Sequence, residues 1–268
     1  MKPNRLVTLL SDFGYEDIYA GAMKGAVLEV DPGIRIVDIT HGIPPQDVFA
    51  GALALRGYAG IFPAGTVHLA VIDPGVGGER KPIVAATESH FYVGPDNGLF
   101  TFITDGEPQV RVYEVADTSV FREPVSAVFH GRDIFGPVAG HLATGRDPAS
   151  FGPPVEDCVR LNVPKAVVEE DSIEGQVISS DRFGNLITNI PNDVLTRFAV
   201  GRTVRVDLAG RWILGLSETY SQQREGILLA LVGSSGMLEI AVNRGSALEA
   251  LDASVGTSVW VSISQAER

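Results

Sequence analysis

The first half of the chain alternates short apolar runs with segments of helical periodicity, and this alternation limits the folds open to it. The runs Leu6–Leu10, Ile34–Ile39 and Thr66–Ile72 have the length and composition of buried strands. A helix is expected in each of the two intervals, and Asp47 is placed to cap the second helix. Strands and helices in this order imply right-handed crossovers and a mostly parallel sheet.

The second half has a different pattern, in which short strands are separated by turn residues. A linker is expected at residues 164–173, where Pro164 precedes a short acidic stretch. The strands expected after it are Gly175–Ser179, Thr203–Leu208, Arg211–Leu216, Ile227–Val232, Met237–Val242 and Ser258–Ile263. The sequence thus predicts an α/β N-terminal domain at residues 1–163 and a smaller all-β, barrel-like C-terminal domain at residues 174–268.

The composition is that of a globular chain with a sizeable core. Of the 268 residues 45% are hydrophobic, and the mean hydropathy is +0.16. The longest apolar runs, such as Ile227–Val232, are too short to cross a bilayer, and the first residues lack the apolar segment of a signal peptide. Cys158 is the single cysteine, so no internal disulfide can form. We therefore expect a soluble, cytoplasmic protein with no membrane partner.

The charge balance narrows the choice of ligands. The chain has 21 basic and 33 acidic residues, for a net charge of −12. This balance argues against a nucleic-acid surface, which needs basic patches for phosphate. The negative net charge is compatible with binding of a cationic small molecule, although a role in solubility alone would also explain the charge. The five histidines show no spacing typical of a zinc site, and we expect neither a metal nor a cofactor.

Two aspartates follow expected strands, at the sheet edge where ligands collect in such folds. Asp12 could accept hydrogen bonds from a ribose diol or could cap the next helix, and both interpretations stay open. Asp73 begins the glycine-rich turn Asp73–Gly78, which lacks the Lys and Ser/Thr of a phosphate loop. Its glycines either let the backbone approach a ligand or form a bare tight turn. Arg80 is near enough in sequence to fold back onto Asp73.

Other polar segments suit a small-molecule pocket. His130 is flanked by Gly131 and charged residues, which favours a loop near a pocket, although a lone histidine is often structural. In Ser179–Asn189, Phe183 could stack on a purine while carboxylate and amide groups read its edge. The alternative for this segment is a strand with a glycine bulge. The turns at residues 233–236 and 243–246 flank one strand and could border the same pocket.

Seven motifs in one order resemble the family of S-adenosylmethionine hydroxide adenosyltransferases, whose relatives include fluorinating and chlorinating enzymes. The resemblance covers nearly the whole chain. The motifs are Ser11–Gly14, Asp38–His41, Asp73–Gly77, Gly94–Leu99, Phe129–Asp133, Asp181–Asn185 and Gly233–Gly236. The resemblance implies hydrolysis of S-adenosylmethionine to adenosine and methionine. It also implies a homotrimer, with each site between the N-terminal domain of one subunit and the C-terminal domain of the next.

The resemblance further implies roles for individual residues. The family's Asp-Arg-His triad matches Asp73, Arg80 and His130, and its ribose-holding aspartate matches Asp12. The other matches are Asp181 and Ser234 near the methionine, and Phe183, Asn185 and Asn243 on the adenine side.

Three departures from the halogenating relatives imply that water is the nucleophile. Asp73 stands where those relatives carry a tyrosine, and Gly131 stands where fluorinating members carry a halide-binding serine. The chain also lacks the long insertion that those enzymes carry before the turn Pro95–Gly98. In addition, Gln46 replaces a tryptophan of fluorinating members, so the ribose wall differs in detail.

The chemistry so implied needs a well-placed water, because methionine leaves C5′ of the ribose as a neutral thioether. Asp73 could hold the water or take its proton, Arg80 would favour the ionised carboxylate, and His130 could orient the pair or relay the proton. Two other functions are kept as alternatives: a module that binds S-adenosylmethionine or a nucleoside without turnover, and a carboxylate-based phosphohydrolase. The second would need a paired-aspartate motif or a magnesium cluster, which the sequence does not show.

Overall fold

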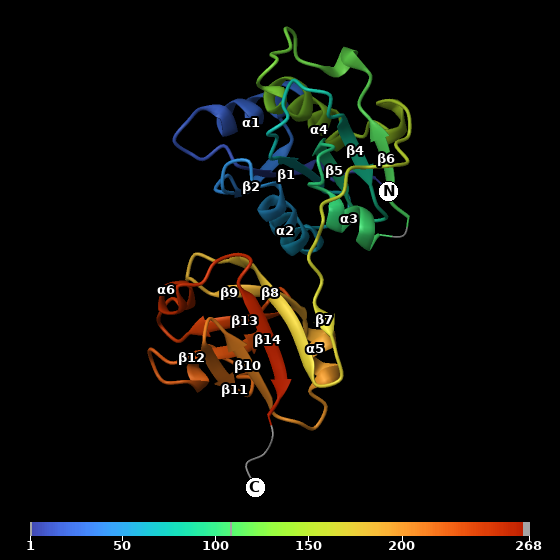
Figure 1. The fold of residues 1–268 in the computed structure, drawn as a ribbon. Helices are drawn as coiled ribbons and strands as arrows, with labels where there is room; N and C mark the ends of the chain where they lie inside the picture. The colour runs from blue at the N-terminus through green and yellow to red at the C-terminus, as the bar shows by residue number, and fades with distance from the viewer. Residues whose placement is uncertain (1, 108, 265–268) are drawn as a thin grey trace. The chain divides into compact units, whose positions relative to one another are not determined.

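The structure is a computed structural model that describes residues 2–107 and 109–264 (Figure 1). The chain forms two compact units, which divide between Leu161 and Asn162. Within those described ranges, no helix has the length and apolar character needed to cross a membrane.

The first unit is built on one six-stranded sheet. Its strands are β1 (Leu6–Ser11), β2 (Arg35–Thr40), β3 (Val67–Val71), β4 (Pro82–Ala86), β5 (Phe91–Pro95) and β6 (Arg111–Glu114), in the order β2-β1-β3-β5-β4-β6. β1 pairs in parallel with β2 and β3, and β3 with β5, whereas β4 is antiparallel to both β5 and β6. The sheet is therefore mixed rather than purely parallel, because the short turn between β4 and β5 permits only antiparallel pairing.

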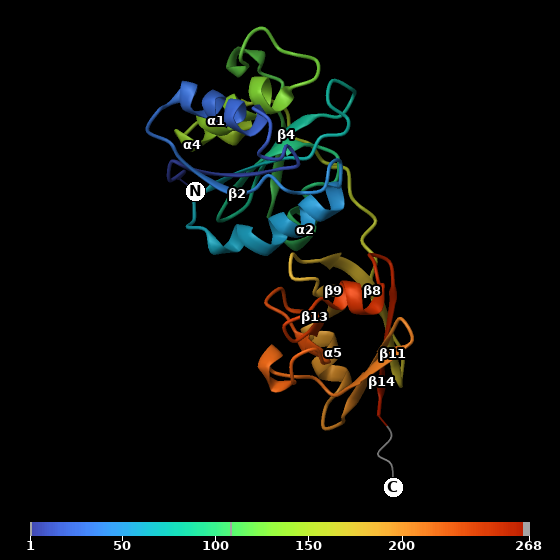
Figure 2. The same ribbon diagram turned by 90° about the vertical axis from the view of Figure 1, so that its left-hand side faces the viewer.

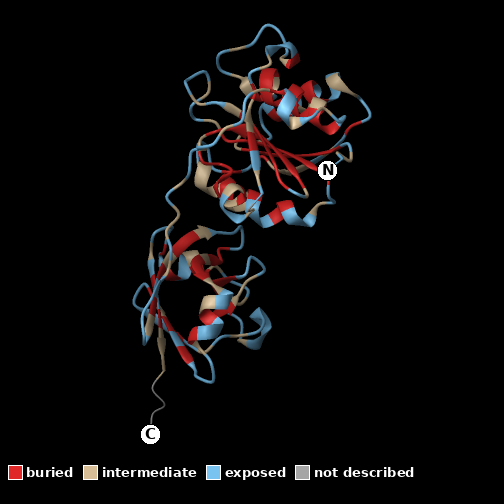
Figure 3. Ribbon diagram, turned by 90° about the vertical axis from the view of Figure 1, so that its right-hand side faces the viewer, coloured by how far each residue is buried: buried red, intermediate tan, exposed pale blue. Residues whose placement is uncertain are grey.

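Helices cover both faces of this sheet (Figures 2 and 3). The helices are α1 (Tyr19–Val30), α2 (Val48–Tyr58), α3 (Thr101–Gly106) and α4 (Gly136–Ala143). α1 and α4 share one core with Leu9, whereas α2 and α3 share the other with Leu10, as the alternation of side chains along a strand requires. α1 and α2 occupy the two expected intervals, and the Asp47 carboxylate accepts the Ala50 N–H at 2.9 Å to cap α2.

The second unit is an antiparallel, barrel-like sheet. Its strands are β7 (Val167–Val168), β8 (Ser172–Ser180), β9 (Leu186–Pro191), β10 (Val204–Leu208), β11 (Arg211–Leu214), β12 (Leu228–Val232), β13 (Met237–Val242) and β14 (Ser258–Ile263). The order is β11-β10-β14-β8-β9-β13-β12, with β7 paired to β8. A bridge between Ser217 and Leu231 brings the chain after β11 to β12, so the sheet nearly closes. The short helices α5 (Asn192–Phe198) and α6 (Ala247–Leu251) pack on its core.

The register of the first sheet brings two polar loops together. Ser11 at the end of β1 pairs with Val71 at the end of β3. Asp12 follows Ser11 directly, and Asp73 lies two residues after Val71. Both aspartates therefore leave the sheet at its carboxyl edge, where ligands were expected.

A buried polar cluster lies within the first unit. Thr8 Oγ1 and His68 Nδ1, on the adjacent strands β1 and β3, are 2.7 Å apart. The ring of His90 lies 5.0 Å from that of His68, measured between centroids. Burial lowers the pKa of His68 to about 3 and also lowers the pKa of His90. Both imidazoles are therefore neutral in the folded protein at neutral pH.

This cluster predicts that the first unit loses stability in acid. An unfolded chain has a His68 pKa near 6.5, so between that pH and about 3 the unfolded state binds more protons than the folded state. The contribution of the neutral imidazole to the free energy of unfolding is complete above pH 6.5. It falls as the pH drops, by up to about 1.4 kcal/mol per pH unit for one imidazole. His68→Leu should flatten this slope.

Amide hydrogen exchange of β3 between pH 7 and 4 measures the effect. Tryptophan fluorescence would not, because Trp212 and Trp260 both lie in the second unit. An unchanged slope in His68→Leu would contradict the assignment.

Candidate active site

Asp73 and Arg80 form a bidentate ion pair that also reaches His130. Arg80 Nε donates to Asp73 Oδ1 at 2.9 Å, and a terminal guanidinium nitrogen donates to Oδ2. The same nitrogen lies 2.8 Å from His130 Nδ1. The Asp73 and Arg80 side chains are only 5% and 10% exposed, and the guanidinium lies over the ring of Phe135. The three residues matched to the family's triad thus form one hydrogen-bonded chain.

The contact with Arg80 fixes the protonation of His130. A guanidinium has only donors, so His130 Nδ1 must accept, and the ring proton resides on Nε2. Burial, followed by the positive charge of Arg80, lowers the pKa of His130. The neutral imidazole therefore offers one N–H and no free acceptor, which leaves Asp73 as the anionic acceptor of the three.

A glycine lets the two loops of this chain meet. Gly77 has φ +75°, and a Cβ at this position would lie 2.2 Å from the Ala127 carbonyl oxygen. At Gly77 the close approach is thus to the backbone of another loop, a use of glycine that neither interpretation from the sequence had named. It docks the turn Asp73–Gly78 against the loop before His130 and so places Arg80 beside the imidazole.

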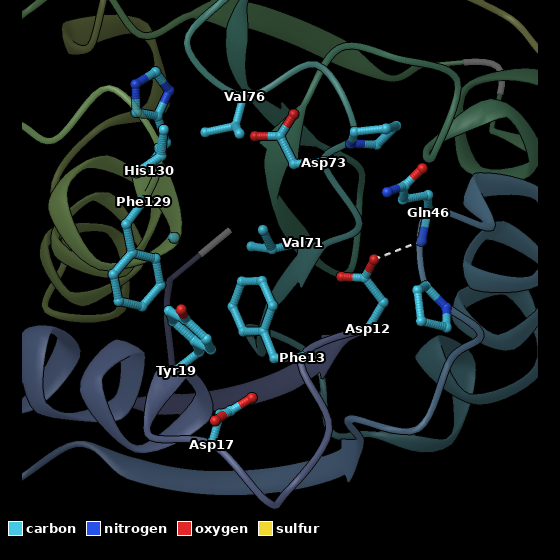
Figure 4. Close-up of a pocket in the computed structure, with 14 residues that line it drawn as sticks. Asp12, Phe13, Asp17, Tyr19, Gln46, Val71, Asp73, Val76, Phe129 and His130 are labelled. Carbon is cyan, nitrogen blue, oxygen red and sulfur yellow. Dashed lines mark hydrogen bonds between the residues drawn. The ribbon is translucent and has the colours of Figure 1, made fainter.

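Asp12 is held by the backbone of another loop (Figure 4). Its Oδ2 accepts the N–H of Gln46 at 2.7 Å. Gln46 has φ +68°, a left-handed conformation that costs a non-glycine residue about 1 kcal/mol or more. Asp12 does not cap the next helix, whose N-cap is Ile18, so that interpretation is wrong. Among the described residues Oδ1 of Asp12 has no hydrogen-bond partner, and this leaves it available to a ligand.

Buried polar groups behind the pocket tie together the loops that follow β1 and β2. Ser11 Oγ lies 2.6 Å from His41 Nδ1, and the Gly14 N–H donates to the His41 carbonyl at 2.7 Å. His41 Nε2 is 3.5 Å from Asp38 Oδ1, and Lys24 donates to the other oxygen of Asp38 at 2.5 Å. These contacts hold the loop of Asp12 against the loop of Gln46, and both residues line the pocket.

A pocket of about 380 Å³ lies at the carboxyl edge of the sheet (Figure 4). Asp12, Asp73 and His130 line it, whereas Arg80 does not and acts on the pocket through its two partners. The pocket therefore presents carboxylates on one side and a neutral imidazole on another.

Three aromatic side chains line another part of this pocket. The rings of Phe13, Tyr19 and Phe129 lie with centroids 5.1 to 6.0 Å apart. A Cβ at Gly131 would lie 3.2 Å from the Phe13 ring. The Phe13 ring therefore packs against the place where a side chain at position 131 would begin.

The second unit contains a pocket of its own, of about 620 Å³. Its lining residues are Asp181, Phe183, Asn185, Tyr220, Ser234, Glu239, Val242, Arg244 and Gly245. Four of the five residues that the family resemblance assigned to this unit are among them. The fifth, Asn243, is not, because its amide donates to the Gln223 carbonyl at 2.8 Å. Its role in binding stays a prediction.

The turn that carries Phe183 is organised by one carboxylate. Asp181 Oδ1 accepts the N–H groups of Phe183 and Asn185, both at 2.9 Å, and Oδ2 accepts the Asn185 side chain at 2.8 Å. Gly184 has φ +79° and packs directly on Ser246. The Phe183 ring is 75% exposed at the pocket, which suits stacking on a flat ligand.

Comparison with known proteins decides the family. The protein-family model of the SAM hydroxide adenosyltransferase N-terminal domain matches residues 7–152. The family model of the C-terminal domain matches residues 175–260. The chain belongs to the S-adenosylmethionine hydroxide adenosyltransferase family. The resemblance inferred from the motifs is thereby confirmed.

Individual relatives match over almost their whole length. The (R)-S-adenosyl-L-methionine hydrolase of Thermus thermophilus is 44% identical, covering 95% of this chain and 98% of the relative. The hydrolase of the same name from Salinispora tropica is 37% identical, with 97% and 99% covered. A fluorinase from Nocardia brasiliensis is 29% identical, with 96% and 97% covered. The structure of an uncharacterized conserved protein from Thermotoga maritima, 34% identical, has a TM-score of 0.90 and covers 96% of this chain and 99% of its own.

Several pocket residues were not singled out from the sequence. Phe13 and Phe129 lie inside recognised motifs, but their contact depends on two distant loops meeting. Tyr220 and Glu239 in the second pocket were missed as well. Glu239 did carry a signal, because it is a carboxylate in the otherwise apolar strand Met237–Val242.

Gly77→Ala is expected to destabilise the first unit by about 2 kcal/mol or more, because its Cβ collides with the Ala127 carbonyl and φ is positive. It should also separate Arg80 from His130, so the His130 pKa should rise toward its ordinary value. Thermal unfolding and NMR titration of His130 measure the two effects. Gly57→Ala in α2 is the control, since a Cβ there meets nothing within 4 Å. A variant at position 77 that titrates like the parent would show that another contact aligns the triad.

Proposed function

We propose that this chain hydrolyses S-adenosyl-L-methionine to adenosine and L-methionine by attack of water at C5′ of the ribose. The observation that carries the proposal is the hydrogen-bonded chain of Asp73, Arg80 and His130 beside a pocket that also holds Asp12. Relatives named as (R)-S-adenosyl-L-methionine hydrolases, 35% to 44% identical to this chain, support the same activity. S-adenosylmethionine is the substrate, and the reaction as written uses no further cofactor.

The step balances with water as its only other reactant. The water oxygen bonds to C5′ as the C5′–S bond breaks, and the electron pair of that bond stays on sulfur. Methionine leaves as a neutral thioether, and one proton is released from the water. Holding the water in line with the C5′–S bond can lower the barrier by up to roughly 7–11 kcal/mol.

The protonation pattern gives each residue a role in this proposal. Asp73 accepts a hydrogen bond from the water and then its proton, because Nδ1 of His130 is already engaged by Arg80. Arg80 pairs with the Asp73 carboxylate and orients it through two hydrogen bonds. His130 donates its Nε2–H to the water oxygen. Asp12 accepts a ribose hydroxyl with its free oxygen.

The second pocket binds the other parts of the substrate in this proposal. Phe183 stacks on the adenine and Asn185 reads its edge, while Asp181 and Ser234 face the methionine. The family resemblance assigns Asn243 to the adenine side as well. We infer a homotrimer in which one subunit's first pocket and the neighbouring subunit's second pocket complete one site; the inference rests on the family resemblance. The cytoplasmic location stays a prediction.

Turnover in ¹⁸O-enriched water tests the reaction directly. The label is expected on the 5′-oxygen of adenosine, with methionine released in equal amount, as measured by mass spectrometry. Added chloride or fluoride should give no appreciable 5′-halogenated nucleoside, because Asp73 is an anion and Gly131 offers no hydroxyl. Binding of S-adenosylmethionine without products would instead identify a binding module, and unlabelled adenosine would overturn water attack at C5′.

Substitutions in the triad are expected to lower kcat far more than they change KM. Asp73→Ala, Arg80→Ala and His130→Ala should each reduce kcat by roughly 10²- to 10⁴-fold, since each removes a group that holds or deprotonates the water. Arg80→Lys should recover little, because an ammonium cannot reproduce the two-pronged contact with Asp73. The exposed neighbour Glu79→Ala is the control. Steady-state kinetics decide the matter, and near-normal kcat in all three variants would rule out the assignment.

A further inference from the structure

Glu239 is a buried carboxylate that faces the second pocket without a cation. It projects from β13, is only 6% exposed and lines the pocket. Among the described residues it forms no ion pair, and the charged neighbour that acts on it is another carboxylate, Asp181. The one cationic side chain lining this pocket in the described chain, Arg244, is largely exposed and lies 3.3 Å from Glu225. An apolar side chain would pack here at far lower electrostatic cost.

The protein is shaped to accommodate this carboxylate. The Tyr220 hydroxyl donates to Glu239 Oε1 at 2.6 Å. A Cβ at Gly233 would lie 2.2 Å from Oε2, so the absence of a side chain at position 233 makes room for that oxygen. Oε2 itself has no hydrogen-bond partner among the described residues. One oxygen is therefore oriented by a phenol, and the other keeps its capacity to accept.

The electrostatics of the pocket call for a positive ligand. Burial and the nearby charge of Asp181 raise the pKa of Glu239, and the hydrogen bond from Tyr220 offsets only part of this effect, so the ionised form is incompletely compensated in the free protein. Asp181 contributes little acceptor capacity, since its oxygens already take three hydrogen bonds from its own turn. A ligand with a cationic N–H donor would satisfy Oε2 and neutralise the charge together.

We propose that Glu239 is a specificity-determining residue that accepts a hydrogen bond from the α-ammonium group of the substrate's methionyl part, with Tyr220 as the residue that positions its carboxylate. This inference rests on the proposed hydrolysis of S-adenosylmethionine. The substrate has two positive centres, the sulfonium and the ammonium. The sulfonium has no N–H, whereas the ammonium has three donors, so only the ammonium matches a free carboxylate oxygen.

The test compares S-adenosylmethionine with its analogue in which hydrogen replaces the α-amino group. The native enzyme should favour the natural substrate in kcat/KM by roughly 10- to 100-fold, the range of a charge-assisted hydrogen bond. Glu239→Gln should bring this ratio close to one by weakening the natural substrate alone. Tyr220→Phe should lower the ratio in part. Glu174→Gln, which removes an exposed carboxylate on β8, should leave it unchanged.

A binding measurement separates this inference from the proposed reaction. Calorimetry with L-methionine and with its amine-free analogue, 4-(methylthio)butanoate, uses no turnover and gives the same expected ratio for the native chain and its loss in Glu239→Gln. Gly233→Ala, which crowds Oε2, should reproduce that loss if the glutamine variant fails to fold. A native chain that binds both compounds equally, or a Glu239→Gln chain that keeps the native ratio, overturns the role of Glu239 whether or not hydrolysis occurs. Absence of hydrolysis with the binding ratio intact would overturn only the proposed reaction.

Discussion

The ion pair between Asp73 and Arg80 is the contact on which the first pocket depends. Two parallel hydrogen bonds fix both planes, and among the described residues the guanidinium's further hydrogen-bond contact is with His130. Because a guanidinium cannot accept, this contact determines which imidazole nitrogen carries the proton. One interaction therefore orients the carboxylate and sets the tautomer of the imidazole. The close approach at Gly77 is what lets the pair form beside His130.

Both pockets bias the protein toward a cationic substrate, but by different means. In the first, the charge of Asp73 is offset by Arg80, which leaves Asp12 and Asp17 as the carboxylates without an ion-pair partner among the residues that line the pocket in the described chain. In the second, Glu239 lies near Asp181, and the one cationic side chain that lines the pocket in the described chain, Arg244, is largely exposed. The net charge of −12 by itself did not require either arrangement. The preference for a cationic ligand follows from whether each pocket carboxylate has a cationic partner, and not from the net charge of the chain.

Sequence patterns predicted the alternation in the first unit and six strands of the second because these follow from local periodicity. β7 lies in the expected linker, and β9 was covered only by the alternative of a strand with a glycine bulge. The antiparallel β4 changed the sheet from mostly parallel to mixed, although the hairpin that causes this is itself short and local. Motif order located Asp73, Arg80 and His130, yet their contact depends on a glycine meeting the Ala127 carbonyl, which no spacing reveals. Glu239 was not identified as a site residue from the sequence, because a single acidic residue in an apolar strand indicates no function until the pocket beside it is known.

The hydrogen-bonding character of the first pocket is itself an argument for water as the nucleophile. Asp73 needs a donor, and His130 with its proton on Nε2 needs an acceptor. A water molecule supplies both at once, since its O–H bonds to the carboxylate while its oxygen receives the imidazole N–H. A halide can only accept, so it would satisfy His130 and leave the anionic oxygen of Asp73 facing another anion. The packing of Phe13 against Gly131 adds a steric condition, because no side chain can enter from position 131 unless that ring shifts. Charge and hydrogen-bond direction thus select the same small, dipolar nucleophile.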